Sequence, residues 1–416
     1  MNERLLQFIW QQQYFNKEQL CTNTGEIVQI IHQGTYNTNQ GPDFSNARII
    51  IDNVQLAGTV ELHLHTSDWK AHGHTEDKNY QNVILHVVWE HDGAVDETVL
   101  ELKGRIANSL LNRYTELMQQ HEQIPCKHFL NTIPDLVWTS WKERLIAERI
   151  QQKSDHINLL LQQTNRHWEE VFWQLLARNF GTPLNSDALE AVAQSVPVSL
   201  LAKHKHQIHQ LEAMLLGQAG LLESSFDDPY TVMLQKEYRY LKKKHGLQLI
   251  HQPLHFLRMR PSNFPTVRLA QLAMLVHQSS HLFSKVIEAE TIQDIKKMFT
   301  VTANDFWHTH YTLTETAPYK KKHLGNAMIE NILINTIIPI LFVYAAEHDA
   351  PQVQQKAIHW LQQLPKENNR ITRVWEEAKA PHENAFDSQA LLYLKKQYCD
   401  AKQCLNCAVG NSILKK

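Results

Sequence analysis

Length, composition and charge limit the classes of protein to which this chain can belong. Its 416 residues are 43% hydrophobic and 20% charged, which is enough apolar material for buried cores and suggests two or three domains. The formal net charge is only −2, so the chain has no overall basic field and could contact a polyanion only through a local patch. The N-terminal segment lacks the apolar stretch of a signal peptide, and five cysteines, an odd number, argue against structural disulfides. We therefore predict a cytoplasmic protein without a membrane partner.

The first 125 residues predict an α+β sheet domain. An apolar stripe predicts an amphipathic helix over residues 3–18, and the pattern then changes to the alternation typical of strands. Strands are expected at residues 26–31, 47–52, 58–64, 83–89 and 98–103. The connections between them leave little room for long crossovers, and turn-forming residues occupy positions 33–42.

Helical periodicity dominates the rest of the chain. We predict a large all-α domain over residues 126–398, followed by a cysteine-rich tail, residues 399–416, that packs back near Cys126. The most apolar run, residues 329–346, contains Glu330, Asn331 and Pro339. It is too short and too polar for a membrane-spanning helix, so we expect a buried core helix.

The chemistry of the first domain is concentrated on one predicted strand and the turn before it. Alternation along the strand places Glu61, His63 and His65 on one face, and Val60, Leu62 and Leu64 on the other. Asp43 stands at the start of the preceding strand. Asp43 and Glu61 would form the minimal carboxylate pair that holds Mg²⁺ or Mn²⁺ for phosphodiester hydrolysis.

The motif Pro42-Asp43 followed by Glu61-Leu62-His63 resembles the PD-(D/E)XK nuclease superfamily. The resemblance covers about the first 100 residues and implies a restriction-endonuclease-like fold, with Asp43 and Glu61 as metal ligands and DNA or RNA as substrate. This chain departs from the pattern at His63, where the family has a lysine that activates the attacking water. A histidine can take over part of that role only with a suitable pKa.

Further histidines keep a second kind of hydrolase open. His72 and His74 precede acidic residues and resemble the ligand run of metallo-β-lactamases, while His63-Leu64-His65 is similar to the first ligands of amidohydrolases. Either resemblance implies a zinc or binuclear metallohydrolase. In the nuclease hypothesis His72 or His74 would assist catalysis; otherwise both lie on a solvated loop. A third hypothesis is a non-catalytic scaffold that binds nucleic acid or protein.

Four cysteines form a possible metal-ligand set. Cys399, Cys404 and Cys407 are closely spaced, and Cys126 stands far upstream. Four thiols suffice for a zinc ion or an iron–sulfur cluster, and some PD-(D/E)XK nucleases have a similar plan of one upstream and three C-terminal cysteines. Reduced structural thiols are the alternative, and Cys21 is the remaining cysteine.

A basic segment stands out in the helical domain. Arg258, Arg260, Asn263 and Arg268 surround two prolines at the start of a predicted helix. Guanidinium groups there could bind the phosphates of a substrate or pair with acidic residues of the first domain.

Taken as a whole, the sequence resembles an uncharacterised bacterial family of unknown function. The matching segments are Gly41–Phe44, Val60–His63, Ser67–Trp69, Val83–Val88, Arg260–Pro265, Asn335–Pro339 and the terminal cysteines. This resemblance spans nearly the full chain and implies no established activity.

Overall fold

The structure is a computed structural model that describes residues 1–250, 252–279 and 281–415. It divides into two compact units. The first contains Met1–Glu143, Asn369–Pro381 and Leu391–Lys416, and the second contains Arg144–Asn368 and His382–Ala390. The predicted boundary at residue 125 follows the change from strand to helix periodicity. The first unit instead extends into helical segments, since α18 (Ala408–Lys415) packs against α3 (Asn108–Gln119).

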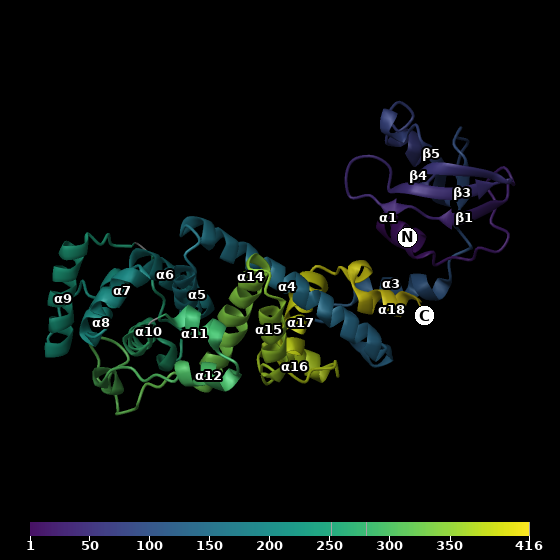
Figure 1. Cartoon of the computed structure of the whole chain (residues 1–416). Coiled ribbons are helices and arrows are strands. Elements are labelled where there is room, and N and C mark those ends of the chain that lie inside the picture. The colour runs from purple at the N-terminus through teal and green to yellow at the C-terminus, as the bar shows by residue number, and fades with distance from the viewer. Residues whose placement is uncertain (251, 280, 416) are drawn as a thin grey trace. The chain divides into compact units, whose positions relative to one another are not determined.

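A mixed sheet forms the centre of the first unit (Figure 1). In the described part of the chain its strands are β1 (Val28–His32), β2 (Thr35–Tyr36), β3 (Phe44–Ile51), β4 (Val54–His65), β5 (Val83–Glu90) and β6 (Val99–Glu101). Their order is β1-β3-β4-β5-β6, with β2 also paired to β3. The β1–β3 and β3–β4 pairs are antiparallel, whereas β4–β5 and β5–β6 are parallel. The expectation of an N-terminal sheet followed by a mostly helical region is thus confirmed.

The parallel pairing of β4 and β5 determines where the next segment lies. Two neighbouring strands can run parallel only if the chain between them returns to the end of the sheet at which the first strand began. Residues 66–82 make this crossover and include the short helix α2 (Asp68–Ala71). Trp69 is buried, and the backbone N–H and hydroxyl of Ser67 donate to the Asp92 carboxylate. The crossover is therefore anchored at its start by a buried indole and by hydrogen bonds.

Helix α1 (Glu3–Gln12) packs against β4 through its apolar side. The Asn2 side chain accepts from the Leu5 N–H and caps the helix. The helix ends at Gln13, which has a left-handed backbone with φ of 57°, rather than at residue 18 as predicted. Trp10 is fully buried and stacks on Phe15, so the chain turns back toward the core immediately after the helix.

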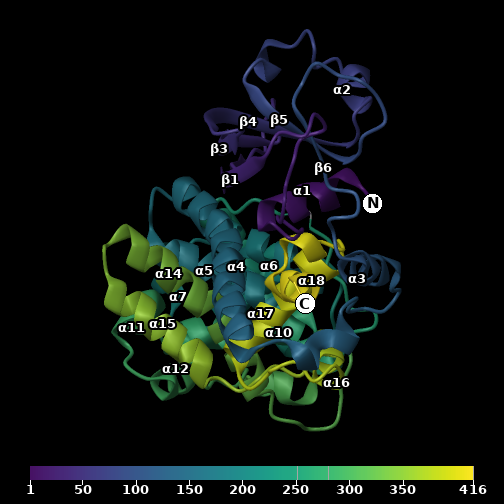
Figure 2. The ribbon, with the colours of Figure 1, turned by 90° about the vertical axis from the view of Figure 1, so that its right-hand side faces the viewer.

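The second unit is built of helices (Figure 2). Helix α4 (Asp135–Gln163) runs from the first unit into the second. The helices that follow it are α5 (Trp168–Phe180), α6 (Thr182–Ser195), α7 (Val198–His204), α8 (Ile208–Gln218), α9 (Pro229–His245), α10 (Pro265–Gln278), α11 (Leu282–Glu288), α12 (Ile292–Met298), α13 (Asn326–Ile332), α14 (Ile338–Glu347), α15 (Pro351–Gln363) and α17 (Ala385–Tyr393). Helix α16 (Arg370–Glu377) belongs to the first unit.

The apolar run predicted as a core helix is the segment from α13 to α14. A π-helical turn, Leu333–Ile337, joins the two helices into one continuous element. In the part of the chain that the structure describes, Asn326–Glu347 is the one helix long and apolar enough to cross a membrane by length and composition. Its most apolar stretch is 72% buried within the protein, as expected for a core helix.

Candidate functional site

Strand β4 carries the centre of the candidate site. Glu61 and His63 are 5% and 1% exposed, and Val60 and Leu62, on the opposite face, are fully buried. Both faces are buried here because β4 lies between β3 and β5 in the sheet, with α1 and the crossover packed against it. His65, the third residue of the polar face, is exposed. A buried carboxyl and a buried imidazole on adjacent positions of one face need polar partners.

Asp43 supplies one of these partners from the start of β3. Its backbone N–H donates to Glu61 Oε2 at 2.9 Å, and its own Oδ2 accepts from the Leu62 N–H at 3.1 Å. The side chain of Gln7 on α1 donates to Asp43 Oδ1 at 2.8 Å. The pairing of Phe44 with Val60 sets this arrangement. The side chains of Asp43 and Glu61 are therefore brought together at the start of β3, and metal binding by this pair stays a prediction.

The two carboxyls are unfavourable as anions in the absence of a cation. Burial, and then the neighbouring Asp43 carboxylate, raise the pKa of Glu61 to about 8. Burial raises the pKa of Asp43 to about 6, although the hydrogen bonds from Gln7 and Leu62 act in the opposite direction. A cation between or beside these groups would favour their charged forms and reverse the shifts.

The crossover brings two more histidines to His63. His72 Nδ1 lies 3.1 Å from His63 Nε2, and one ligand atom from each of His63, His72 and His74 lies within 4.8 Å of the others. Glu61 Oε1 lies 3.5 Å from His63 Nε2 and 3.6 Å from His74 Nε2. His74 stacks on Tyr80, with ring centroids 3.7 Å apart. The ligand atoms of the three imidazoles thus converge, and Glu61 lies beside His63 and His74.

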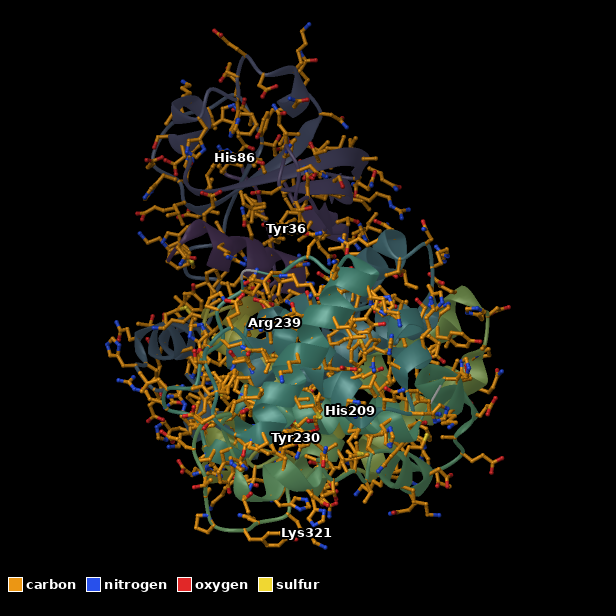
Figure 3. The ribbon with its side chains drawn as sticks, turned by 90° about the vertical axis from the view of Figure 1, so that its left-hand side faces the viewer. Tyr36, His86, His209, Tyr230, Arg239 and Lys321 are labelled. Carbon is orange, nitrogen blue, oxygen red and sulfur yellow. The ribbon has the colours of Figure 1, made fainter. Side chains whose placement is uncertain are left out.

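Strand β5 adds a residue behind this group. Figure 3 labels His86 in the sheet region. The parallel register places His86 opposite Glu61, and His86 Nε2 lies 2.9 Å from His63 Nδ1. Burial and the neighbouring histidines lower the pKa of His63 to about 3, and burial is the main cause of the lower pKa of His86, about 4. Both rings are therefore neutral. If His63 Nδ1–H donates to His86, the lone pair of His63 Nε2 points toward the site, which is the usual way in which a second residue orients a metal-binding histidine.

The separations between neighbouring atoms of this group are those expected of adjacent ligands of a transition-metal ion. With metal–nitrogen and metal–oxygen distances of about 2.0–2.1 Å, neighbouring ligand atoms of a tetrahedron are about 3.3–3.4 Å apart. The separations of 3.1, 3.5 and 3.6 Å bracket that value. In addition, the buried His74 Nε2 has no hydrogen-bond partner among the described residues. A set rich in imidazole nitrogen suits zinc and similar ions, whereas the Asp43–Glu61 pair taken alone offers the oxygen ligands that Mg²⁺ prefers.

The predicted basic segment belongs to the second unit. Arg258 and Arg260 are exposed, but Arg268 is buried. Its guanidinium donates to Asn263 Oδ1 at 2.6 Å and to Gln271 Oε1 at 2.9 Å, and burial lowers its pKa to about 10. Arg268 thus ties the turn at Pro261–Asn263 to α10, which is a structural role. Substrate binding by this segment stays a prediction.

Sequence reasoning missed the supporting residues of the site. It gave no role in the site to His86, Gln7, Trp69 or Tyr80. Trp69 packs edge-on against His74 and Tyr80 stacks on it, so aromatic residues hold the imidazole on both sides. The available signal was the position of both aromatics in the same short segment as His72 and His74.

Comparison with known proteins identifies a family for the chain. No curated protein and no solved structure matches it. A family model described as "Protein of unknown function (DUF2851)" matches residues 3–370, a span that includes every histidine and carboxylate of the site together with Cys126. The expectation of a family of unknown function is confirmed, and the chain belongs to the DUF2851 family.

Proposed function

We propose that this protein is a metal-dependent hydrolase whose ion, zinc or a similar transition metal, is held by His63, His72 and His74, with Glu61 as the adjacent carboxylate. The observation that supports it most strongly is the convergence of the three ligand atoms within 4.8 Å of one another. Glu61 Oε1 lies 3.5 Å from His63 Nε2 and 3.6 Å from His74 Nε2. Neutral histidines are the form that binds such ions.

The residues around the ion have separate tasks in this proposal. When bound, the ion supplies Lewis-acid activation of water and of the scissile group. Glu61 Oε2 stays fixed by the Asp43 N–H, so Oε1 is held in one direction, toward the imidazoles. Glu61 is then positioned either to complete the ligand set or to accept a proton from water. His86 keeps His63 in the required orientation.

Metal content is the first test of this proposal. The purified protein should contain about one transition-metal ion at the histidine site, and His72→Ala and His74→Ala should each lose it. His65→Ala is the matched control because His65 lies on the same strand and is exposed. Zinc, or whichever non-iron ion the wild type holds, would contradict the site if both crossover variants retained it. Hydrolysis is then assayed on phosphodiester, phosphomonoester, ester and amide model substrates, and turnover lost in both variants would support the hydrolase.

A Mg²⁺- or Mn²⁺-dependent nuclease is the second candidate. It is favoured by Asp43 and Glu61, which lie side by side at the β3–β4 junction of a mixed sheet, with His63 two residues further on β4. A restriction-endonuclease-like domain is the fold that this candidate requires. Incubation with DNA and RNA plus Mg²⁺ or Mn²⁺ tests it, with Asp43→Asn as the variant. Cleavage lost in Asp43→Asn while zinc binding persists would favour the nuclease. Salt-sensitive binding without turnover would instead favour a non-catalytic scaffold.

A further inference from the structure

A second group of potential metal ligands lies in the first unit, apart from the histidine site. It consists of Cys126, Cys399, Cys404 and Cys407, which we name the cysteine cluster. Helix α18, which follows Cys407, contacts both the turn Lys127–Thr132 after Cys126 and the turn Cys404–Asn406, and the turn Leu394–Cys399 contacts Cys404–Asn406. Cys126, Cys404 and Cys407 are each 8% exposed. Folding thus brings together residues that are more than two hundred positions apart in the sequence.

Four separate structural elements deliver these thiols. Cys126 immediately precedes the 3-10 turn Lys127–Thr132, and Cys399 ends the π-helical turn Leu394–Cys399. Cys404 opens a 3-10 turn, and Cys407 is the last residue before α18. The side chain of Tyr14 donates to Asn411 on α18 at 2.7 Å. The C-terminal segment is thereby fixed against the N-terminal part of the same unit.

The backbone of α18 packs closely against the turn that carries Cys404. A Cβ atom at Gly410 would clash with the Cys404 carbonyl oxygen, so the first turn of α18 can approach the 404–407 turn only with glycine at that position. The backbone N–H groups of Gly410 and Val409 are directed at the Cys407 sulfur. Donors directed at sulfur stabilise a thiolate, which is the metal-binding form.

The distances between the four sulfur atoms distinguish a site for an iron–sulfur cluster from a site for a single zinc ion. Around one zinc ion, with zinc–sulfur distances of about 2.3 Å, tetrahedral thiolates lie about 3.8 Å apart. Among the described residues, the histidines form the group whose ligand atoms all lie within 4.8 Å of one another, and no three of the four thiols do so. An iron–sulfur cluster distributes its thiolates over several iron atoms and requires a wider set.

We propose that Cys126, Cys399, Cys404 and Cys407 ligate an iron–sulfur cluster that ties the C-terminal segment to the region around Cys126. The cluster has a structural role in this proposal, and it is independent of the histidine site and of the proposed hydrolase activity. Its removal should loosen α18 and the 404–407 turn, because these segments are short and depend on the cluster to hold their ends together.

Anaerobic purification tests the proposal. The full-length protein should be brown, with iron and acid-labile sulfide each at about four per chain, as for a four-cysteine cluster. Cys399→Ser should lose colour, iron and sulfide, whereas Cys21→Ser, which removes the fifth cysteine, should keep them. Since a variant can lose the cluster by misfolding, the wild-type protein is also stripped of iron, its free thiols are titrated, and it is reconstituted with iron and sulfide. Four additional reactive thiols after stripping, and return of the spectrum on reconstitution, support the proposal.

Three results would overturn the proposal. Zinc is counted in His72→Ala so that the histidine site does not contribute to the total. One zinc per chain in that variant, without iron or sulfide, would assign a single-ion site to the cysteines. A colourless, metal-free protein that fails to reconstitute would mean that the four thiols are ordinary core side chains. Colour retained in Cys399→Ser would exclude that residue as a ligand.

Discussion

Replacing Glu61 with glutamine should make the metal-free protein more stable at neutral and mildly alkaline pH. The pKa of Glu61 is raised from 4.5 to about 8 in the folded protein. As pH rises, the unfolded chain loses this proton near pH 4.5 while the folded protein keeps it until about pH 8. The stability of the wild-type protein therefore falls across this interval, by up to about 1.4 kcal/mol for each pH unit.

The expected gain from Glu61→Gln follows from this window. The wild-type carboxyl costs on the order of 3 kcal/mol at pH 7, but the buried glutamine amide keeps part of the desolvation cost. The amide oxygen can still accept from the Asp43 N–H. We therefore expect the variant to be about 1–3 kcal/mol more stable than the wild type at pH 7–8, and equal to it near pH 4.5.

Denaturant unfolding of chelator-treated protein at pH 4.5, 6 and 8 measures this difference. Glu76→Gln, at an exposed acid of the same crossover, is the control and should follow the wild type at every pH. A Glu61→Gln protein that is less stable than the wild type at pH 8 would refute the reasoning, because it would mean that folded-state contacts favour the Glu61 anion. With zinc at about 100 times its Kd, the advantage of the variant should shrink by about 2.7 kcal/mol, because the wild type gains that amount and the variant gains little.

Further predictions concern the metal site and the second unit. Zinc should raise the unfolding temperature of the wild type by about 5–11 °C, for a unit of roughly 150–250 residues. His72→Ala should remove most of this increase, whereas His65→Ala should keep it. Equal increases in both variants would contradict the ligand assignment. His86→Phe should weaken zinc binding roughly 10–100-fold in a competition titration, because it removes the acceptor that orients the metal-binding imidazole; unchanged affinity would exclude that role. Zinc affinity should rise between pH 6 and pH 8, as the Glu61 proton is released more easily, and a flat titration would argue against Glu61 as part of the site. Arg268→Met should lower the stability of the second unit by about 1–3 kcal/mol, since two amide side chains lose their partner, with zinc binding unchanged; reduced zinc binding would show that the residue does more than support the turn.

The candidate metal site gathers groups that reduce the stability of the metal-free protein. A carboxyl with a raised pKa, a second carboxyl beside it, and imidazoles with lowered pKa values lie within one buried region. Strongly shifted pKa values of this kind concentrate where proteins bind ions or carry out catalysis.

Local patterns were sufficient to predict the elements and part of the site. Alternation along residues 60–65 placed Glu61 and His63 on one face, because side chains of a strand point alternately to its two sides. The Pro42-Asp43 turn placed a second acid at the start of the neighbouring strand, and antiparallel pairing of β3 with β4 brought it to Glu61. Helical periodicity similarly predicted the helix-rich second unit, although the π-helical turn at Leu333–Ile337 left no signal in that pattern.

The sequence by itself determined which face of β4 carries the acid and the imidazole, and which thiols are available for a metal. Only the tertiary structure decided that β4 and β5 run parallel. That pairing sends residues 66–82 across the sheet and brings His72 and His74 to His63, with His86 behind them. Strand direction depends on contacts between segments far apart in the chain, and a local pattern is the same in parallel and antiparallel pairs. The same limit applies to Cys126 and the C-terminal cysteines, whose meeting depends on how the whole first unit folds.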